Sequence, residues 1–149
     1  AAGPSYIIKA MEILQSQSTS NPTSISQVAA EAALSGDQAC MDPMIKAFRE
    51  RHAYVVKSFN EIPGLYCIEA EGAFYAFPDA RKAIEHLFNQ KVLKEKTDLA
   101  LADYLLEKEG VAVVPGSAFG SDGYFRISFA TSMENLIEAM KRIKRALSV

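Results

Sequence analysis

GVAVVPGSAFGSDGYFRISFA, which runs from Gly110 to Ala130, is the part of the sequence that indicates most about the fold. Gly110 is expected to end a helix, because glycine adopts the left-handed conformation that follows many helix C-caps. Residues 111–114 form a valine-rich run typical of a buried strand, and Pro115 is expected to end it because proline has no N–H for the ladder. Residues 124–130 alternate apolar and polar side chains and predict a second strand.

Arg126 is the one charged residue of this second strand, and it has two interpretations. The alternation by itself favours an ordinary arginine on the wet face of an antiparallel sheet. Alternatively, its planar guanidinium would hold both oxygens of a carboxylate at once, which lysine cannot do. The glycine-rich loop 116–123 directly before it would leave room for a small ligand. The residues alone leave both interpretations open.

Composition describes an ordinary globular protein. The chain has 149 residues, a net charge of −2 and 49% hydrophobic residues, which suits one domain with a real core. No basic block is present, so nucleic acid is not an expected partner. Cys40 and Cys67 match no disulfide or metal spacing and suit a reducing compartment. No apolar run approaches a membrane span, and the first residues do not form a signal peptide, so the expected location is the cytoplasm.

Apolar residues recur at helical spacing in six segments, separated by glycine, proline and polar signals. The predicted helices are 4–14, 22–34, 43–62, 78–88, 98–109 and 132–147. Thr97 or Asp98 is expected to cap the fifth of them, and Thr131 and Glu134 have capping-box spacing at the start of the last. Two further short strands, 65–69 and 73–77, are expected to pair as a hairpin. The sequence therefore predicts an α+β fold: a small three- to four-stranded sheet with helices packed on one face, and an N-terminal helical arm.

Four stretches of the chain resemble the class I pyridoxal-phosphate-dependent aminotransferases of fold type I, of the aspartate aminotransferase kind. They are AAGP at the start, TSNPTS at residues 19–24, NEIPGL followed by EGAFYAFPD up to Asp79, and the run 110–130 itself. The resemblance covers the whole chain but only the last third or so of such an enzyme. It implies that residues 1–37 are an arm belonging to the large domain, that residues 38–149 are the C-terminal small domain, and that the helix 43–62 bridges the two.

The same resemblance implies roles for three residues. Arg126 would bind the α-carboxylate of the substrate, and Ser20 and Asn21 would lie near the cofactor of the neighbouring subunit in a homodimer. For Asn21 the residues also allow a structural role as a helix N-cap, with Pro22 at the first helical position. The family's Schiff-base lysine belongs to an S-K-x-x-x-x-G-x-R-x-G motif expected just ahead of AAGP. No catalytic residue is therefore assigned here, and this chain by itself is expected neither to bind pyridoxal phosphate nor to transaminate.

The resemblance implies that the full-length parent exchanges an amino group between an amino acid and a 2-oxo acid, with aspartate as the expected substrate. Ser16 stands where the animal enzymes have an arginine for a second carboxylate, so the amino acid itself stays open. Two alternatives remain: an aminotransferase of the same fold for aromatic or alanine-like substrates, and a non-catalytic interaction domain. No metal site and no membrane partner are expected.

Overall fold

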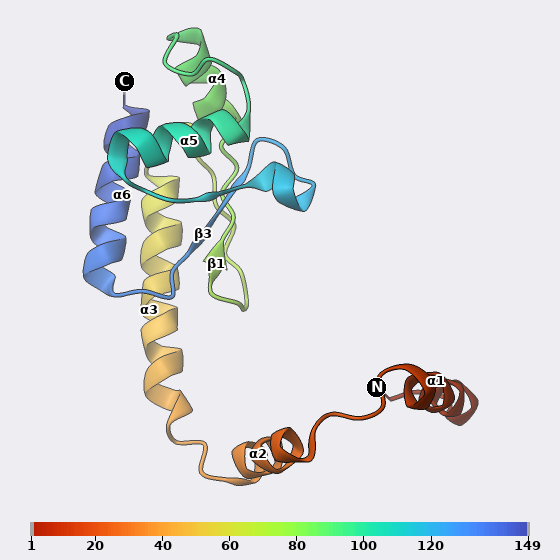
Figure 1. Ribbon diagram of the computed structural model, residues 1–149. Helices are drawn as coiled ribbons and strands as arrows, with labels where there is room; N and C mark the ends of the chain where they lie inside the picture. The colour runs from red at the N-terminus through yellow and green to blue at the C-terminus, as the bar shows by residue number, and fades with distance from the viewer. Residues whose placement is uncertain (1, 149) are drawn as a thin grey trace. The chain divides into compact units, whose positions relative to one another are not determined.

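The computed structural model describes residues 2–148, and the chain divides into two compact units, Ala1–Asp42 and Pro43–Val149. Figure 1 shows the helices and strands of each unit. The domain boundary predicted between residues 37 and 38 falls slightly before this division and stays a prediction.

The first unit contains two helices, α1 (Ser5–Ser18) and α2 (Ser24–Ser35), neither of which has a buried residue. Helix α1 continues past its predicted end at residue 14 and ends at Ser18, within the polar segment 15–21. The hydroxyls of Ser16 and Ser18 donate to main-chain carbonyls one turn earlier, which accommodates both serines within α1. Helix α2 is capped by the hydroxyl of Thr23, which accepts from the N–H of Ser26. The alternative that Asn21 caps this helix is therefore wrong.

The second unit is built on a three-stranded antiparallel sheet of order β1-β3-β2. Its strands are β1 (Tyr75–Ala76), β2 (Val114–Pro115) and β3 (Phe125–Ser128). All three are shorter than predicted, and residues 111–113 do not belong to a strand. Pro115 is the last residue of β2, where it pairs with Phe125, so it ends the strand as predicted. The central strand buries Phe125 and Ile127 on one face and turns Arg126 to the other.

The predicted strand 65–69 does not form, so the predicted hairpin with residues 73–77 is wrong. The side-chain amide of Asn60 takes the place of a neighbouring strand. Its Oδ1 accepts from the N–H of Cys67 at 2.8 Å, and its Nδ2 donates to the Cys67 carbonyl at 3.0 Å. Of this segment only Tyr66 makes a strand-like contact, an isolated bridge to Asp79.

Four helices complete the second unit, and α5 contacts both α6 and β2 (Figure 1). They are α3 (Met41–Asn60), α4 (Arg81–Asn89), α5 (Asp98–Glu109) and α6 (Met133–Leu147). Phe59 of α3, Leu105 of α5 and Ile143 of α6 are fully buried with Phe125 of the sheet. The predicted α+β fold is thus confirmed.

The helix ends follow local chemistry. Gly110 lies just past α5 with φ +66°, the left-handed conformation predicted for it. Thr97 caps α5, as one of the two residues predicted, whereas α6 is capped by Ser132 and not by Thr131. Helix α4 begins at Arg81 rather than near residue 78. Among the described residues, no helix is both long and apolar enough to cross a membrane.

Candidate functional site

Arg126 lies on the central strand of the sheet, where its side chain is half-buried. Its guanidinium carbon lies 4.5 Å from the ring centroid of Tyr75 and 4.4 Å from that of Phe119. The five ion pairs formed between described residues do not include Arg126. Among the described residues, this cation therefore has two aromatic neighbours and no ion-pair partner.

Phe119 reaches Arg126 from a short 3-10 helix, η1 (Gly116–Phe119), which directly follows β2. The turn is tight: the N–H of Gly116 donates to the Tyr124 carbonyl at 2.8 Å, and the Gly116 carbonyl accepts from Ser121 at 3.0 Å. A Cβ atom at Gly116 would lie 2.4 Å from the carbonyl oxygen of Ser121, so no other residue fits without moving the backbone. The glycine-rich loop is therefore a tight, internally hydrogen-bonded turn that places Phe119 beside Arg126.

Asp98, the first residue of α5, holds this turn through a hydrogen bond. Its carboxylate accepts from the N–H of Ser117 at 2.6 Å, and the residue is only 4% exposed. Burial is the largest single influence on the pKa of Asp98 and acts to raise it. Hydrogen bonds from Ser117, from the backbone of Asp98 itself and from the backbone of Gly123 together outweigh burial, so the pKa is lowered overall. The carboxylate is therefore ionised beneath η1. From the sequence Asp98 could be identified only as a possible helix cap, because nothing near it in the chain indicates its contact with Ser117, 19 positions further along.

Tyr75 reaches Arg126 from the opposite flank of the sheet. It lies on β1 opposite Ser128 of β3, and its ring packs against that of Phe74 at 4.2 Å between centroids. The carbonyl of Phe74 accepts from the N–H of Phe129 at 2.9 Å, which extends the contact between the two segments. Ala73, directly before Phe74, has a left-handed backbone with φ +65° in the turn that leads into β1.

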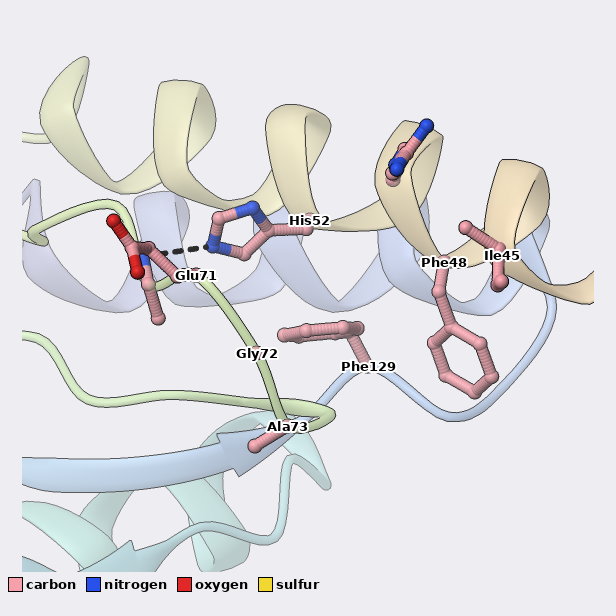
Figure 2. Close-up of a pocket in the computed structure, with 9 residues that line it drawn as sticks. Ile45, Phe48, His52, Glu71, Gly72, Ala73 and Phe129 are labelled. Carbon is pink, nitrogen blue, oxygen red and sulfur yellow. Dashed lines mark hydrogen bonds between the residues drawn. The ribbon is translucent and has the colours of Figure 1, made fainter.

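A pocket of about 320 Å³ lies beside this turn, between the turn and α3 (Figure 2). Figure 2 shows His52 pointing from α3 toward the turn, where its Nε2 accepts from the N–H of Ala70 at 3.3 Å. His52 is half-buried, and its ring centroid lies 5.5 Å from that of Phe129. Ile45, Phe48 and Phe129 are apolar residues of the pocket lining, and Arg126 does not line it.

Two other ionisable residues, Cys67 and Glu109, are in environments that favour a structural role. Burial raises the pKa of the Cys67 thiol, which keeps it protonated. Glu109 pairs with Arg145 of α6, and the side-chain hydrogen bond from Arg145 lowers its pKa. No group of three or more potential metal ligands occurs among residues 2–148.

The lysines of the described chain do not fit a Schiff-base role. All ten are exposed, whereas a lysine that holds a cofactor covalently must lie in a site from which water is excluded. None of them contacts the rings around Arg126. Among the described residues, Arg126 has the chemistry to bind a carboxylate, and no buried lysine lies beside it.

Ser20 and Asn21 lie in the first unit, in the exposed connection between α1 and α2. Ser20 has φ +60°, a left-handed conformation that is uncommon for a residue other than glycine. The connection thus has a defined and unusual backbone. Their predicted proximity to a cofactor of a neighbouring subunit stays a prediction.

Comparison with known proteins gives consistent matches along the whole chain. The family model for aminotransferases of class I and II matches residues 1–143. The aspartate/prephenate aminotransferase of Nitrosomonas europaea is 61% identical over 98% of the chain, which corresponds to 37% of that protein. The aspartate aminotransferase of Bacillus subtilis is 47% identical over 97% of the chain and 35% of its own length. The chain therefore spans little more than a third of these relatives.

Solved structures match the fold equally well. The aspartate aminotransferase of Rhizobium meliloti superposes with a TM-score of 0.81 at 44% identity, over 99% of this chain and 36% of that one. An aromatic aminotransferase from Pyrococcus horikoshii gives a TM-score of 0.80 at 37% identity, over 98% and 37% respectively.

Proposed function

Because this chain belongs to the class I and II aminotransferases, we propose that it is the C-terminal part of a pyridoxal-phosphate-dependent aminotransferase and that Arg126 binds the substrate carboxylate. The reaction is the exchange of an amino group between an amino acid and a 2-oxo acid. The observation that supports the role of Arg126 is its guanidinium, stacked between Tyr75 and Phe119 with no described acid beside it. A cation placed in this way is available to a carboxylate from outside the chain.

In this proposal Arg126 binds and orients the substrate. A guanidinium that donates two parallel N–H bonds to one carboxylate fixes the direction of the substrate as well as its position. Orientation of this kind converts binding energy into rate, because the reacting bond is then held where the chemistry occurs. The exposed lysines of this chain do not fit the attachment of pyridoxal phosphate, so no step of the cofactor's chemistry is assigned to them.

Aspartate is the proposed amino donor, since curated relatives carry the names of aspartate and prephenate aminotransferases. A second candidate is an aromatic amino acid, which the structural match to an aromatic aminotransferase supports. Comparing kcat/KM of the full-length protein for aspartate, phenylalanine and alanine separates these substrates.

The two units also have proposed roles. Residues 1–37 act as a helical arm of the large domain and residues 38–149 as the small domain, in a homodimer of the cytoplasm. Ser20 and Asn21 then approach the cofactor of the neighbouring subunit. The exposed apolar side chains of both helices in the first unit support this, because they need a surface to cover them. These side chains are Tyr6, Ile7, Met11, Ile13, Leu14, Ile25, Val28 and Leu34.

The test of the proposed function is Arg126→Lys in the full-length protein. Lysine keeps the charge but cannot make the paired bonds, and losing one charge-assisted hydrogen bond costs about 1.5–3 kcal/mol, so kcat/KM should fall at least about tenfold. Arg51→Lys is the matched control, because Arg51 also stacks on a ring, 5.5 Å from the centroid of Phe48, but lies on α3. A variant at Arg126 that is fully active, or that simply unfolds, would contradict the assignment.

A further inference from the structure

We propose that Tyr75 and Phe119 are positioning residues that hold the guanidinium of Arg126 between their rings, so that it meets the substrate carboxylate already oriented. This inference rests on the proposed carboxylate-binding role of Arg126. It adds two aromatic residues, from segments far apart in the sequence, to the binding of that carboxylate.

The geometry that carries the proposal is the placement of the two rings on either flank of the central strand. Strand β3 has β1 on one side and β2 on the other. Tyr75 belongs to β1, and Phe119 belongs to η1 directly after β2, so the two rings approach Arg126 from the two flanks. Their centroids lie 4.5 and 4.4 Å from the guanidinium carbon. Both distances are well inside the range of about 6 Å over which a cation is attracted to a ring face.

Stacking of this kind leaves the N–H edge of the guanidinium as the part that can bind a ligand. The rings lie over the guanidinium, whereas its edge carries the donors that match the two oxygens of a carboxylate. An arginine free to rotate about four side-chain bonds would lose that freedom on binding. A stacked arginine has already lost much of this rotational freedom, so the entropy cost of ordering it on binding is smaller.

Each ring is itself held in place. The rings of Phe119 and Phe77 make a T-shaped contact with their centroids 6.2 Å apart, and Phe77 stacks on Tyr124 with centroids 5.4 Å apart. Asp98 fixes the turn that carries Phe119 through its bond to Ser117. On the other flank, Tyr75 packs against Phe74. The two rings are therefore parts of fixed segments, which is what a positioning role requires.

The first test replaces each ring with leucine in the full-length protein, as Tyr75→Leu and Phe119→Leu. Leucine keeps apolar bulk but removes the π face. We expect each variant to raise KM for the amino acid substrate about fivefold, and to change kcat less than about twofold, because the rings act on binding through Arg126. Tyr66→Leu is the control: Tyr66 is 62% exposed and makes no ring contact with Arg126. It should leave both constants unchanged.

A double-mutant cycle shows whether the rings act through Arg126. In a background that already carries Arg126→Ala, the two leucine variants should have no further effect on KM. A further loss in that background would mean that the rings contact the substrate or support the fold independently, and would overturn the proposal. If Arg126→Lys weakens activity while both leucine variants retain the parent KM, the carboxylate role stands and the positioning role falls. If Arg126→Lys has no effect, both fall together.

A measurement without substrate gives an independent answer. In the NMR spectrum of the ¹⁵N-arginine-labelled protein, the Nε–H of Arg126 should be shifted upfield by the ring currents of its two neighbours. Each leucine variant should return part of that shift toward the value of a solvated arginine. An Arg126 signal at the solvated position in the parent protein would overturn the proposal whatever the kinetics.

Discussion

Replacing Asp98 with asparagine tests whether the loop that carries Phe119 is fixed by a buried charge. Asparagine has the same shape and still offers an oxygen to the N–H of Ser117, but the negative charge is lost. A hydrogen bond to a charged group contributes about 1.5–3 kcal/mol and a neutral one about 0.5–1.5 kcal/mol. Asp98 is 4% exposed and its bond to Ser117 measures 2.6 Å, so the charged range applies. We expect Asp98→Asn to lower the free energy of unfolding by about 1–2 kcal/mol near neutral pH.

The pH dependence of the free energy of unfolding shows whether the charge of Asp98 causes this stabilisation. The pKa of Asp98 is lower in the folded chain than in the unfolded chain. Its ionised form therefore stabilises the fold at every pH above the unfolded value of about 3.9, and this contribution is lost as the pH falls through the folded value. The difference in stability between the parent and Asp98→Asn should accordingly be present at neutral pH and disappear in acid.

Urea unfolding followed by circular dichroism is the suitable assay, because the chain has no tryptophan. Asp103→Asn is the control: Asp103 lies on the same helix, but its side chain is exposed. It should leave the midpoint unchanged. Equal stability of Asp98→Asn and its parent at neutral pH, or a loss that persists unchanged in acid, would refute the role given to this carboxylate.

Two further predictions concern the tight loop and the first unit. Gly116→Ala should lower the free energy of unfolding by about 2 kcal/mol or more, since the added Cβ would meet backbone oxygens of Ser121 and Tyr124 at 2.4 and 2.7 Å. Gly72→Ala, where nothing lies within 4 Å of the new atom, should be neutral in the same urea titration. Residues 4–35 should either exchange their amide hydrogens faster than β3 or mediate self-association of the 149-residue chain, because neither α1 nor α2 buries a residue. Light scattering combined with hydrogen exchange checks this, and a monomer with a fully protected first unit would contradict it.

The helices could be predicted from the sequence because their signals are local. Apolar spacing and a stop residue such as Gly110 lie within the helix or directly beside it. The strand prediction failed where a side chain outside the segment takes the backbone hydrogen bonds. The segment 65–69 has the composition of a strand, but the side chain of Asn60 takes the hydrogen bonds of Cys67 that a strand would need. Caps were misassigned where two suitable residues stand together, as at Thr131 and Ser132, since both have the necessary hydroxyl.

The role of Arg126 also depends on residues that lie far from it in the sequence, so the local pattern does not determine it. Strand alternation predicted that Arg126 faces away from the core, but an arginine facing water and one facing a ligand have the same local pattern. What separates them is the surroundings: Tyr75 from β1, Phe119 from η1, and Asp98 beneath η1, bonded to Ser117, a residue 19 positions further along the chain. A surface arginine needs no such rings, because water solvates its charge equally well in many rotamers. Two rings that restrict one guanidinium, one of them on a turn held by a buried carboxylate, are favourable for function only when the orientation of that guanidinium matters. Orientation matters when the partner is a planar group bound through two parallel hydrogen bonds.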